Sequence, residues 1–525
     1  MKILILTLFF IFTSSFNLFP QWSTDPNNNL VIGYGLNPEL CSDSAGGCYI
    51  TYEAGYPAEL YLHRVDKYGY QPWGDKRIIA GELEEQKSAK IIEDGEGGVI
   101  VSYGDHILHD SYRLRIQKVD SSGNLLWGST GQRVSLVDTG QSVQRLVTDG
   151  DGGCVIVWME SNFGFAEYRI NRIDRNGQRV WSNSGIYIQS NYNYSPPNLV
   201  RASDGNYYLQ ISTILYRISH NGQIIRKDSV TLGYPVADPE GGVVLSGRVG
   251  TINNRRLVAQ RKDSIGNNLW QEPYVEIADS LGLGSFRIGI NYRIVNYAWL
   301  GTYNGQTDRP FFQAINMDGN IVYQNKILLS EYPSGTTLIG IISSYYNNTI
   351  FSWSVSGEIN SIFAQMYDTL GNKTWSENGV IIAHPRMTNQ QYTTDGRGGL
   401  VAGGTINEFT IVAQQVSING NLGEIVTSIM EDYEEALPLE TILYQNYPNP
   451  FNSSTIIRYE IPIAEKVRIN LYNILGEKIL TLFEGEQSSG YHQIILSSDG
   501  LSSGIYFYSL ETTSSRQINK LTIIK

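Results

Sequence analysis

The feature that most constrains the fold of this chain is a unit that recurs between residues 40 and 423. Each clear copy has an Asp, a Gly three residues later and a Trp four residues after that. Marker glycines of this kind stand at eight positions: Gly69, Gly123, Gly177, Gly222, Gly266, Gly319, Gly371 and Gly420. The steps between them range from 44 residues (Gly222 to Gly266) to 54 residues (Gly69 to Gly123). Such even spacing predicts eight equivalent structural units.

Each unit has a second glycine turn upstream of the marker, followed by alternating β-branched residues. Examples are residues 94–98, 149–153, 238–242 and 395–399. Gly tolerates the positive φ that hairpin turns need, so each unit is predicted to hold two hairpins, or four short strands. Four strands repeated at a step near fifty residues are typical of a β-propeller.

We therefore expect an all-β chain with an eight-bladed propeller over residues 22–425, seven blades being the alternative. A β-solenoid repeat is usually shorter, and a string of sandwiches would not share one motif at so even a step. Leu30 to Tyr34 precede the first hairpin, so we expect them to complete the last blade and close the ring. The Gly-His and Trp-Asp dipeptides of one familiar propeller class are absent.

Composition agrees with a turn-rich β protein. The chain holds 53 Gly, 35 Tyr and 9 Trp, and only 17 % of its residues are charged. Its formal net charge of −12 argues against nucleic acid as a partner, because phosphate binding needs clustered Lys and Arg.

The motif residues are predicted to be structural. The Asp of each clear copy should accept hydrogen bonds from its own turn, and the Trp should fill space between blades. The positions concerned are Asp66, Asp120, Asp174, Asp263 and Asp368, with Trp73, Trp127, Trp181, Trp270 and Trp375.

The first residues have the order of a secretory signal peptide. A positive start at Lys2 is followed by an apolar run from Ile3 to Phe12 and by small polar residues. The run is too short to span a bilayer, which needs about twenty residues. We expect a signal peptide over residues 1–21, and no transmembrane segment later in the chain.

The chain changes character after the repeats. An acidic stretch ending in proline predicts a linker over residues 426–440, and period-2 alternation bounded by Gly and Pro predicts a small immunoglobulin-like β-sandwich over residues 441–525. Its segments are Asn446-Tyr447-Pro448-Asn449-Pro450-Phe451-Asn452, Val467 to Gly476, Leu501-Ser502-Ser503-Gly504-Ile505-Tyr506-Phe507-Tyr508 and Lys520 to Lys525.

These segments, in this order, closely resemble the type A C-terminal sorting domain of the type IX (Por) secretion system. The sorting-motif residues of the resemblance are Pro448, Asn449, Pro450, Phe451, Gly476, Gly504, Tyr506, Lys520 and Lys525. The resemblance implies a bacterium of the Bacteroidetes–Chlorobi kind and a partner, the outer-membrane translocon, that recognises residues 441–525. It also implies that this domain is usually removed, leaving the cargo released or attached to the cell surface.

Three cysteines are present, and two of them flank a turn. Cys41 and Cys48 could face each other across a hairpin as a disulfide in an oxidising compartment. The alternative is two small buried hydrophobic residues, and Cys154 favours it, because that residue has the position of Cys48 in another repeat without a partner nearby.

Signals of catalysis or of a cofactor are weak. Six histidines are scattered, and only His106 and His109 stand close together, without the other ligands of a metal site. The turns at Asp94-Gly-Glu96 and Asp149-Gly-Asp151 offer oxygens for calcium but lack its full ligand count. No catalytic residue is identified, and the repeat differs from that of sialidases in the register of its Asp.

Two functions from different classes remain open. The first is a non-catalytic protein whose blade loops bind a glycan or a protein. The alternative is a secreted polysaccharide hydrolase or lyase with carboxylates that converge on the propeller axis. The scarcity of catalytic residues favours binding.

Overall fold

The computed structural model describes residues 22–524, except residues 75–84, 109–110, 138, 163–164, 192–194, 252–253, 271–272, 280–285, 292, 304–305, 331–335, 344–347, 425–440, 447–448, 453, 462–464, 488–489, 499 and 514. The expected signal peptide and linker therefore lie outside the described residues. Every regular element of the described part is a β-strand. No helix there could cross a membrane.

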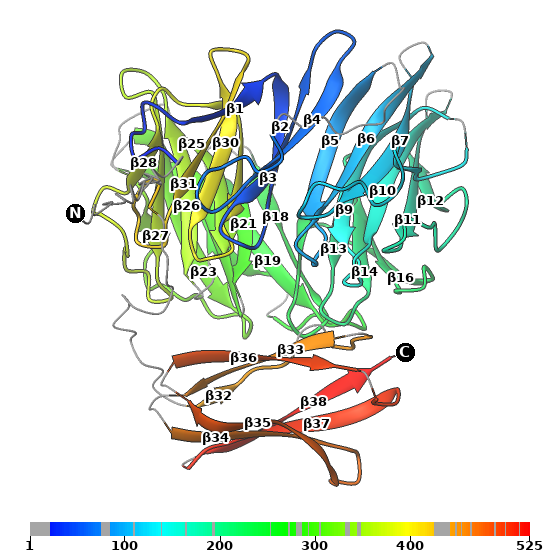
Figure 1. Ribbon diagram of the computed structural model, residues 1–525. Helices are drawn as coiled ribbons and strands as arrows, with labels where there is room; N and C mark the ends of the chain where they lie inside the picture. Colours follow the sequence, from blue (N-terminus) through cyan, green and yellow to red (C-terminus); the bar gives the residue numbers. More distant parts are fainter. Residues whose placement is uncertain are drawn as a thin grey trace, which may run out of the picture.

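Between Leu30 and Val416 the described residues form eight antiparallel sheets (Figure 1). The first has three strands: β2 (Leu36–Ser42), β3 (Cys48–Ala54) and β4 (Glu59–Val65). The second has β5 (Gln86–Glu93), β6 (Val99–Leu108), β7 (Ser111–Val119) and β8 (Gln132–Arg133). The third has β9 (Gln141–Thr148), β10 (Cys154–Asn162), β11 (Phe165–Ile173) and β12 (Ile186–Asn191). The fourth has β13 (Asn198–Arg201), β14 (Tyr207–Ile211), β15 (Ile214–Ile218) and β16 (Ile224–Ser229).

The remaining sheets repeat this order. The fifth has β17 (Gly233–Ala237), β18 (Val243–Thr251), β19 (Asn254–Lys262) and β20 (Val275–Ala278). The sixth has β21 (Arg287–Asn291), β22 (Ile294–Tyr303), β23 (Gln306–Asn316) and β24 (Ile327–Leu328). The seventh has β25 (Thr336–Ser343), β26 (Thr349–Val355), β27 (Ser361–Tyr367) and β28 (Val380–Ala383). The eighth has β29 (Thr388–Thr394), β30 (Leu400–Ile406) and β31 (Thr410–Val416), completed by β1 (Leu30–Tyr34) from the start of the chain.

The sheets follow one another around a closed ring. The first strand of each sheet packs against the first strand of the next, from β2 and β5 through to β25 and β29, and β29 packs against β2. Eight hydrophobic clusters lie at these contacts, and each combines residues of two neighbouring sheets. This arrangement of packed, twisted sheets is a β-propeller, as the repeat predicted.

The ring is closed by a strand from the beginning of the chain. β1 pairs antiparallel with β31, with Leu30 opposite Ala413 and Tyr34 opposite Thr410. One cluster joins Trp22 and Ile32 to residues of β3 and of β30 and β31. The expectation that Leu30 to Tyr34 complete the last sheet is confirmed, and the pairing covers an edge strand that would otherwise be exposed.

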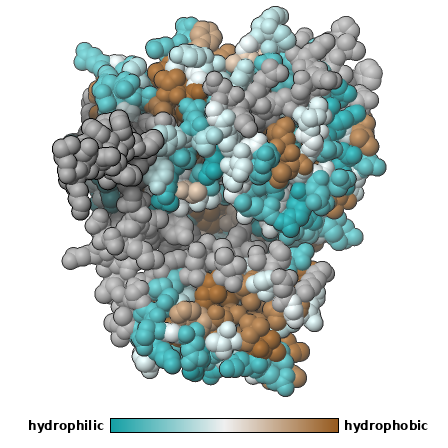
Figure 2. Space-filling view, in the orientation of Figure 1, coloured by the Kyte–Doolittle hydropathy of each residue, from teal (hydrophilic) through white to brown (hydrophobic). Residues whose placement is uncertain are grey.

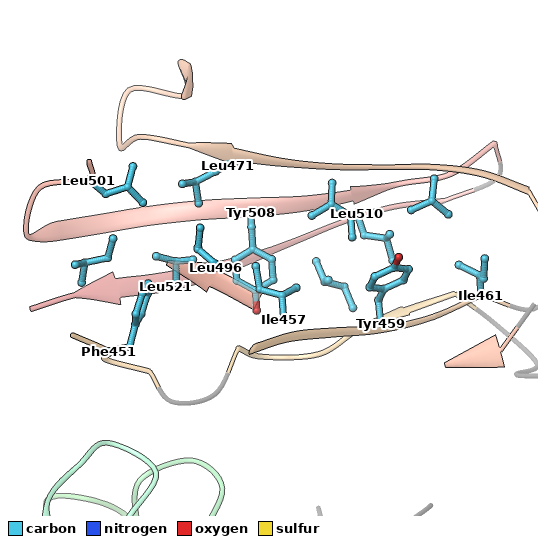
Figure 3. Packing of buried hydrophobic residues seen from close by; sticks show 14 residues of the cluster. Phe451, Ile457, Tyr459, Ile461, Leu471, Leu496, Leu501, Tyr508, Leu510 and Leu521 are labelled. Atoms are coloured by element: carbon cyan, nitrogen blue, oxygen red, sulfur yellow. The ribbon is translucent and has the colours of Figure 1, made fainter. Parts of the chain in front are cut away.

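The C-terminal part folds into a second body with two sheets. One sheet has the order β32 (Ile442–Leu443), β33 (Ser454–Ile461) and β36 (Gly490–Ser497). The other has the order β35 (Lys478–Gln487), β34 (Glu465–Tyr472), β37 (Gly504–Glu511) and β38 (Arg516–Ile523). Buried residues from both sheets form a single core between Leu443 and Ile523 (Figure 3).

Candidate functional site

The Asp of the marker motif organises its own turn, as predicted. The Asp120 carboxylate accepts hydrogen bonds from the backbone N–H groups of Ser122 and Asn124, both at 2.9 Å. Gly123 follows in this turn with a φ of 87°, which a residue with a side chain rarely adopts. The same two carboxylate contacts recur at Asp66, Asp174, Asp263 and Asp368.

The motif Trp residues connect each sheet to the next. The Trp73 indole N–H donates to the Ser121 carbonyl of the following turn at 3.1 Å, and its ring covers Gly123. Trp127, Trp181, Trp270 and Trp375 make the equivalent bond to the next turn. These Trp residues are structural, and their spacing predicted that role.

The upstream glycine turns hold buried ion pairs. The Asp149 carboxylate accepts backbone N–H bonds from Asp151 and Gly153, and it pairs with Arg172 at 2.8 Å. Asp94 lies 3.2 Å from the Lys118 ammonium, which also contacts Glu96 at 2.6 Å. A basic side chain therefore lies where the calcium hypothesis would put the ion. No group of three or more potential metal ligands occurs among the described residues.

Of the two alternatives for Cys41 and Cys48, the structure contradicts the possible disulfide and agrees with two small buried residues. Cys41 and Cys48 are free thiols. Cys41 lies opposite Tyr49, whereas Cys48 lies opposite Ser42, so the two positions differ by one residue in register. Side chains one residue apart point to opposite faces of a sheet, and each thiol lies in a different hydrophobic cluster. Burial raises the pKa of both thiols and of Cys154.

The histidine pair His106 and His109, considered as metal ligands, lies only partly within the residues that the structure describes. His109 lies outside the described residues, and the His106 ring packs against Tyr112 at 5.5 Å between centroids. Tyr112 in turn donates to Glu85 at 2.8 Å.

Three buried carboxylates lie near one end of the first three sheets, and each has a partner: Asp105 and Glu160 hold equivalent positions in the second and third sheets, and Glu53 lies one residue out of that register in the first. Asp105 pairs with Arg115 at 2.9 Å, and Glu160 pairs with Arg169 at 2.9 Å. Glu53 accepts the Ser88 backbone N–H at 2.6 Å and the Asn37 amide at 3.0 Å. The Asp105–Arg115 and Glu160–Arg169 pairs join strands of one sheet, whereas the contact of Glu53 with Ser88 joins the first sheet to the second.

An exposed aromatic group marks the place where β1 passes into β2. Tyr56, at the turn between β3 and β4, is 99 % exposed, Tyr34 is 71 % exposed and Phe409 is 55 % exposed. The Gly35 N–H, next to Tyr34, donates to the Phe409 carbonyl at 2.7 Å. A Cβ on Gly35 would lie 2.3 Å from the Glu53 carbonyl, so the chain passes close to the end of β3 as it runs from β1 of the last sheet into β2 of the first. We call Tyr34, Tyr56 and Phe409 the aromatic crossing; the sequence repeat gave no signal for it.

The sorting-motif residues that are described tie the N-terminal segment of the sandwich to its last strand. The Asn449 side-chain oxygen accepts the Thr522 N–H at 2.8 Å, and its amide donates to the Lys520 carbonyl at 3.1 Å. Phe451 is buried and bridges Ile523. Gly476 closes a tight turn with a φ of 79°, and the Tyr506 hydroxyl donates to the Ser502 carbonyl at 3.0 Å. Pro450 and Gly504 are also described, whereas Pro448 and Lys525 are not.

Tyr508 forms hydrogen bonds to the backbone of Tyr444 and Asn446, just before the sorting-motif residues that begin at Pro448. Its hydroxyl donates to the Tyr444 carbonyl at 2.7 Å and accepts the Asn446 N–H at 2.6 Å.

Replacing Tyr508 with Phe leaves both backbone groups without this partner. We expect Tyr508→Phe to lower the free energy of unfolding of the sandwich by about 1–3 kcal/mol. Urea denaturation of the wild-type and variant chains would measure the difference. Tyr506→Phe is the control, because its hydroxyl makes an exposed contact. An equal effect of the two variants would contradict this role for Tyr508.

Figure 2 shows a brown, hydrophobic area on the visible face of the sandwich. Several large apolar side chains of the sandwich are exposed. They come from a turn and from β35, β37 and β38: Ile474, Leu475, Ile479, Leu480, Ile505 and Ile518. Exposed apolar groups of this kind are typical of surfaces that contact another protein.

Comparison with known families assigns the C-terminal part. Residues 445–525 match the secretion system C-terminal sorting domain, so the chain carries a sorting domain of the type IX secretion system. This confirms the resemblance seen in the sequence. No curated protein matches the chain.

Among solved structures the likenesses are weak. The β-propeller domain of the Trilobed protease from Pyrococcus furiosus is 10 % identical, with 65 % of this chain and 100 % of that chain covered and a TM-score of 0.40. A polysaccharide lyase, an ulvan lyase, is 9 % identical, with 76 % and 97 % covered and a TM-score of 0.40. An endo-arabinase from Bacteroides thetaiotaomicron is 11 % identical, with 55 % and 96 % covered and a TM-score of 0.26. These scores support no statement about activity.

Proposed function

We propose that this is an exported, non-catalytic binding protein, in which a signal peptide (1–21) and a sorting domain (441–525) deliver an eight-bladed propeller (22–425) to the cell surface or medium. The first blade has three strands among the described residues and the other seven have four. The C-terminal domain engages the type IX translocon, with its exposed apolar side chains as the contact surface, and is then removed.

The observation that carries the binding role is the aromatic crossing. Two tyrosines and a phenylalanine from two neighbouring sheets are exposed at the same end of those sheets: Tyr34 at the end of β1, and Tyr56 and Phe409 on the turns between β3 and β4 and between β30 and β31. Tyr rings offer a flat apolar face together with a polar hydroxyl, which suits ligands that have both kinds of surface. A glycan has both, with apolar ring faces and hydroxyl edges, so we propose a glycan as the ligand class.

The hydrolase or lyase alternative is less well supported. The buried carboxylates at the ends of the first three sheets are engaged by Arg side chains or by hydrogen bonds. Screening the exported chain on a glycan array and on a panel of polysaccharides separates the two functions. Saturable binding without turnover supports the proposal, and measurable cleavage of any polysaccharide contradicts it.

Replacing the three aromatic residues tests the site. The variant Tyr34→Ala, Tyr56→Ala, Phe409→Ala should bind the glycan found in the screen at least about 10-fold more weakly, because exposed aromatic anchors dominate such contacts. Its melting temperature should stay near that of the wild type, since these side chains are exposed. Tyr187→Ala is the matched control, because Tyr187 is 49 % exposed on another sheet. Unchanged affinity of the triple variant would exclude this site, and binding of proteins but no glycan would exclude the ligand class.

A further inference from the structure

The first strands of the eight sheets form the inner face of the ring, since each packs against the first strand of the next sheet. All side chains of β29 and most of those of β21 are at least partly exposed. The side chains of the second strands β14 and β26, by contrast, are buried throughout. Propeller blades surround a central channel, and this difference in burial indicates that solvent reaches the first strands from it.

The inner face is basic, although the whole chain has 39 Lys and Arg against 51 Asp and Glu. The eight first strands hold two acidic residues, Glu39 and Glu93, and five basic ones. The basic residues are Lys87, Lys90, Arg145, Arg201 and Arg287. Positive charge gathered on one face of an acidic protein attracts anionic ligands to that face.

Three of these cations share one level of the ring. Lys90 and Arg145 each lie opposite the fourth residue of the strand that follows. Arg287 holds the same level opposite Ala298, the fifth residue of β22, because β22 begins one residue before the equivalent start of β6 and β10. The other residues of this level are Glu39, Asn198, Gly233, Gly340 and Gln391. One acidic side chain therefore accompanies three basic ones.

The two acidic residues of the inner face are already engaged. Glu39 forms an ion pair with Lys90 across the first and second sheets, and Glu93 accepts the Ser44 hydroxyl at 2.6 Å. Within the part of the chain that the structure describes, Arg145 forms no ion pair, and its guanidinium donates to the preceding carbonyl at 3.1 Å. A guanidinium has five N–H donors in a fork that fits a carboxylate or another oxyanion, so Arg145 can bind an anionic group.

Arg287 lies beside an exposed aromatic ring. Tyr234, at a bulge of β17, is 51 % exposed and packs edge-on against Phe286, with 5.0 Å between the ring centroids. Its φ of 52° is rare for a bulky residue, and bulges commonly re-aim a side chain near a functional site. The Tyr ring and the neighbouring guanidinium together offer an apolar face and a positive charge, which match the ring face and the charged group of an acidic sugar.

We propose that the inner face of the ring binds an acidic polysaccharide, with Arg145 and Arg287 contacting carboxylate or sulfate groups and Tyr234 contacting a sugar ring. The two cations belong to the third and sixth sheets, so a polymer with repeated charges suits them better than one small anion. Tyr234 lies near the start of its first strand, at the end of the ring that also carries the aromatic crossing. The inference rests on the proposed glycan-binding function and adds a requirement for negative charge.

The test measures the affinity of the exported chain, residues 22–525, for polygalacturonate and dextran sulfate, with dextran as the neutral probe, by isothermal titration at constant ionic strength. The wild type should bind at least one acidic polymer, and dextran at least about 10-fold more weakly. Arg145→Gln and Arg287→Gln should each weaken binding of the acidic polymer about 10-fold, because each removes a hydrogen bond to a charged group. The melting temperature of each variant shows whether it is folded.

Lys227→Gln is the matched control, because it removes one positive charge from an exposed position on β16, the fourth strand of its sheet. Its affinity should stay within about 2-fold of the wild type, since an exposed charge far from the ligand is screened by salt. The proposal is overturned if neither acidic polymer binds saturably, if dextran binds equally well, or if Lys227→Gln weakens binding as much as Arg145→Gln. Binding of inorganic sulfate without either polymer would also overturn it.

The variant Tyr34→Ala, Tyr56→Ala, Phe409→Ala separates this proposal from the glycan site at the aromatic crossing. Binding of a neutral glycan that this variant loses and Arg145→Gln keeps would leave the aromatic crossing in place and overturn the acidic ligand. Binding of an acidic polymer that Arg145→Gln weakens and the triple variant keeps would support the inner face and exclude the aromatic crossing.

Discussion

Removal of residues 441–525 is expected to leave a folded ring that stays in the periplasm of the native host. The core of the sandwich consists only of residues between Leu443 and Ile523, and the eight clusters of the ring contain none of them. Independent cores predict independent folding. The effect on export should be all-or-none, because these residues are the sorting domain. Fractionation of cells and immunoblotting of medium, surface and periplasm would measure it.

The complementary fusion controls for an indirect effect of truncation. Residues 441–525 attached to an unrelated periplasmic protein should carry that protein to the surface or medium. The circular dichroism and melting temperature of the truncated chain should match those of the ring in the full chain. A truncated chain that still reaches the surface, or a ring that unfolds without its sandwich, would show that the domain has a structural role instead.

Deleting residues 22–34 should have the largest effect on the stability of the ring. The deletion exposes the paired edge of β31 and removes Trp22, which is 1 % exposed and whose indole N–H donates to the Asp66 carbonyl at 3.2 Å. Replacing a buried Trp by Ala alone costs about 3–5 kcal/mol. We expect Trp22→Ala to shift the urea midpoint downward, and the deletion to unfold or aggregate the chain, because an open edge strand pairs with other chains.

A peptide of residues 22–35 added in trans provides the control. It can pair with β31 by strand addition, so it should restore part of the lost stability of the deleted chain in a concentration-dependent way. A version of the peptide with Trp22→Ala should be less effective. An unchanged urea midpoint after the deletion would mean that the pairing of β1 with β31 does not stabilise the ring.

The repeating part of the fold could be predicted from the sequence because its determinants are local. An Asp that accepts its own turn's N–H groups and a Gly at positive φ need only neighbouring residues, as at Asp120 and Gly123. The even spacing of such turns then predicts the sheets. The Trp positions followed from the same spacing, although not their bonds to the next turn.

Features that depend on register or on long-range contacts could not be predicted. A shift of one residue between Cys41 and Cys48 decides whether they face each other, and their separation along the chain does not reveal it. Trp22 contacts the turn at Asp66 without belonging to any repeat. The aromatic crossing depends on the pairing of β1 with β31 of the last sheet, which places Tyr34 opposite Thr410 and so next to Phe409.

Closure of the ring by β1 also sets an order of events during export. If the proposed signal peptide directs export from the N-terminal side, β1 enters the periplasm before its partner β31, which follows almost the whole repeat array. The earlier sheets can form as they emerge, but the two ends cannot meet until the last repeat has crossed the inner membrane, and such long-range pairing is slow. The sorting domain crosses only after β31. We therefore expect the ring to be closed before the chain is handed to the outer membrane, so that the protein crosses its second membrane folded.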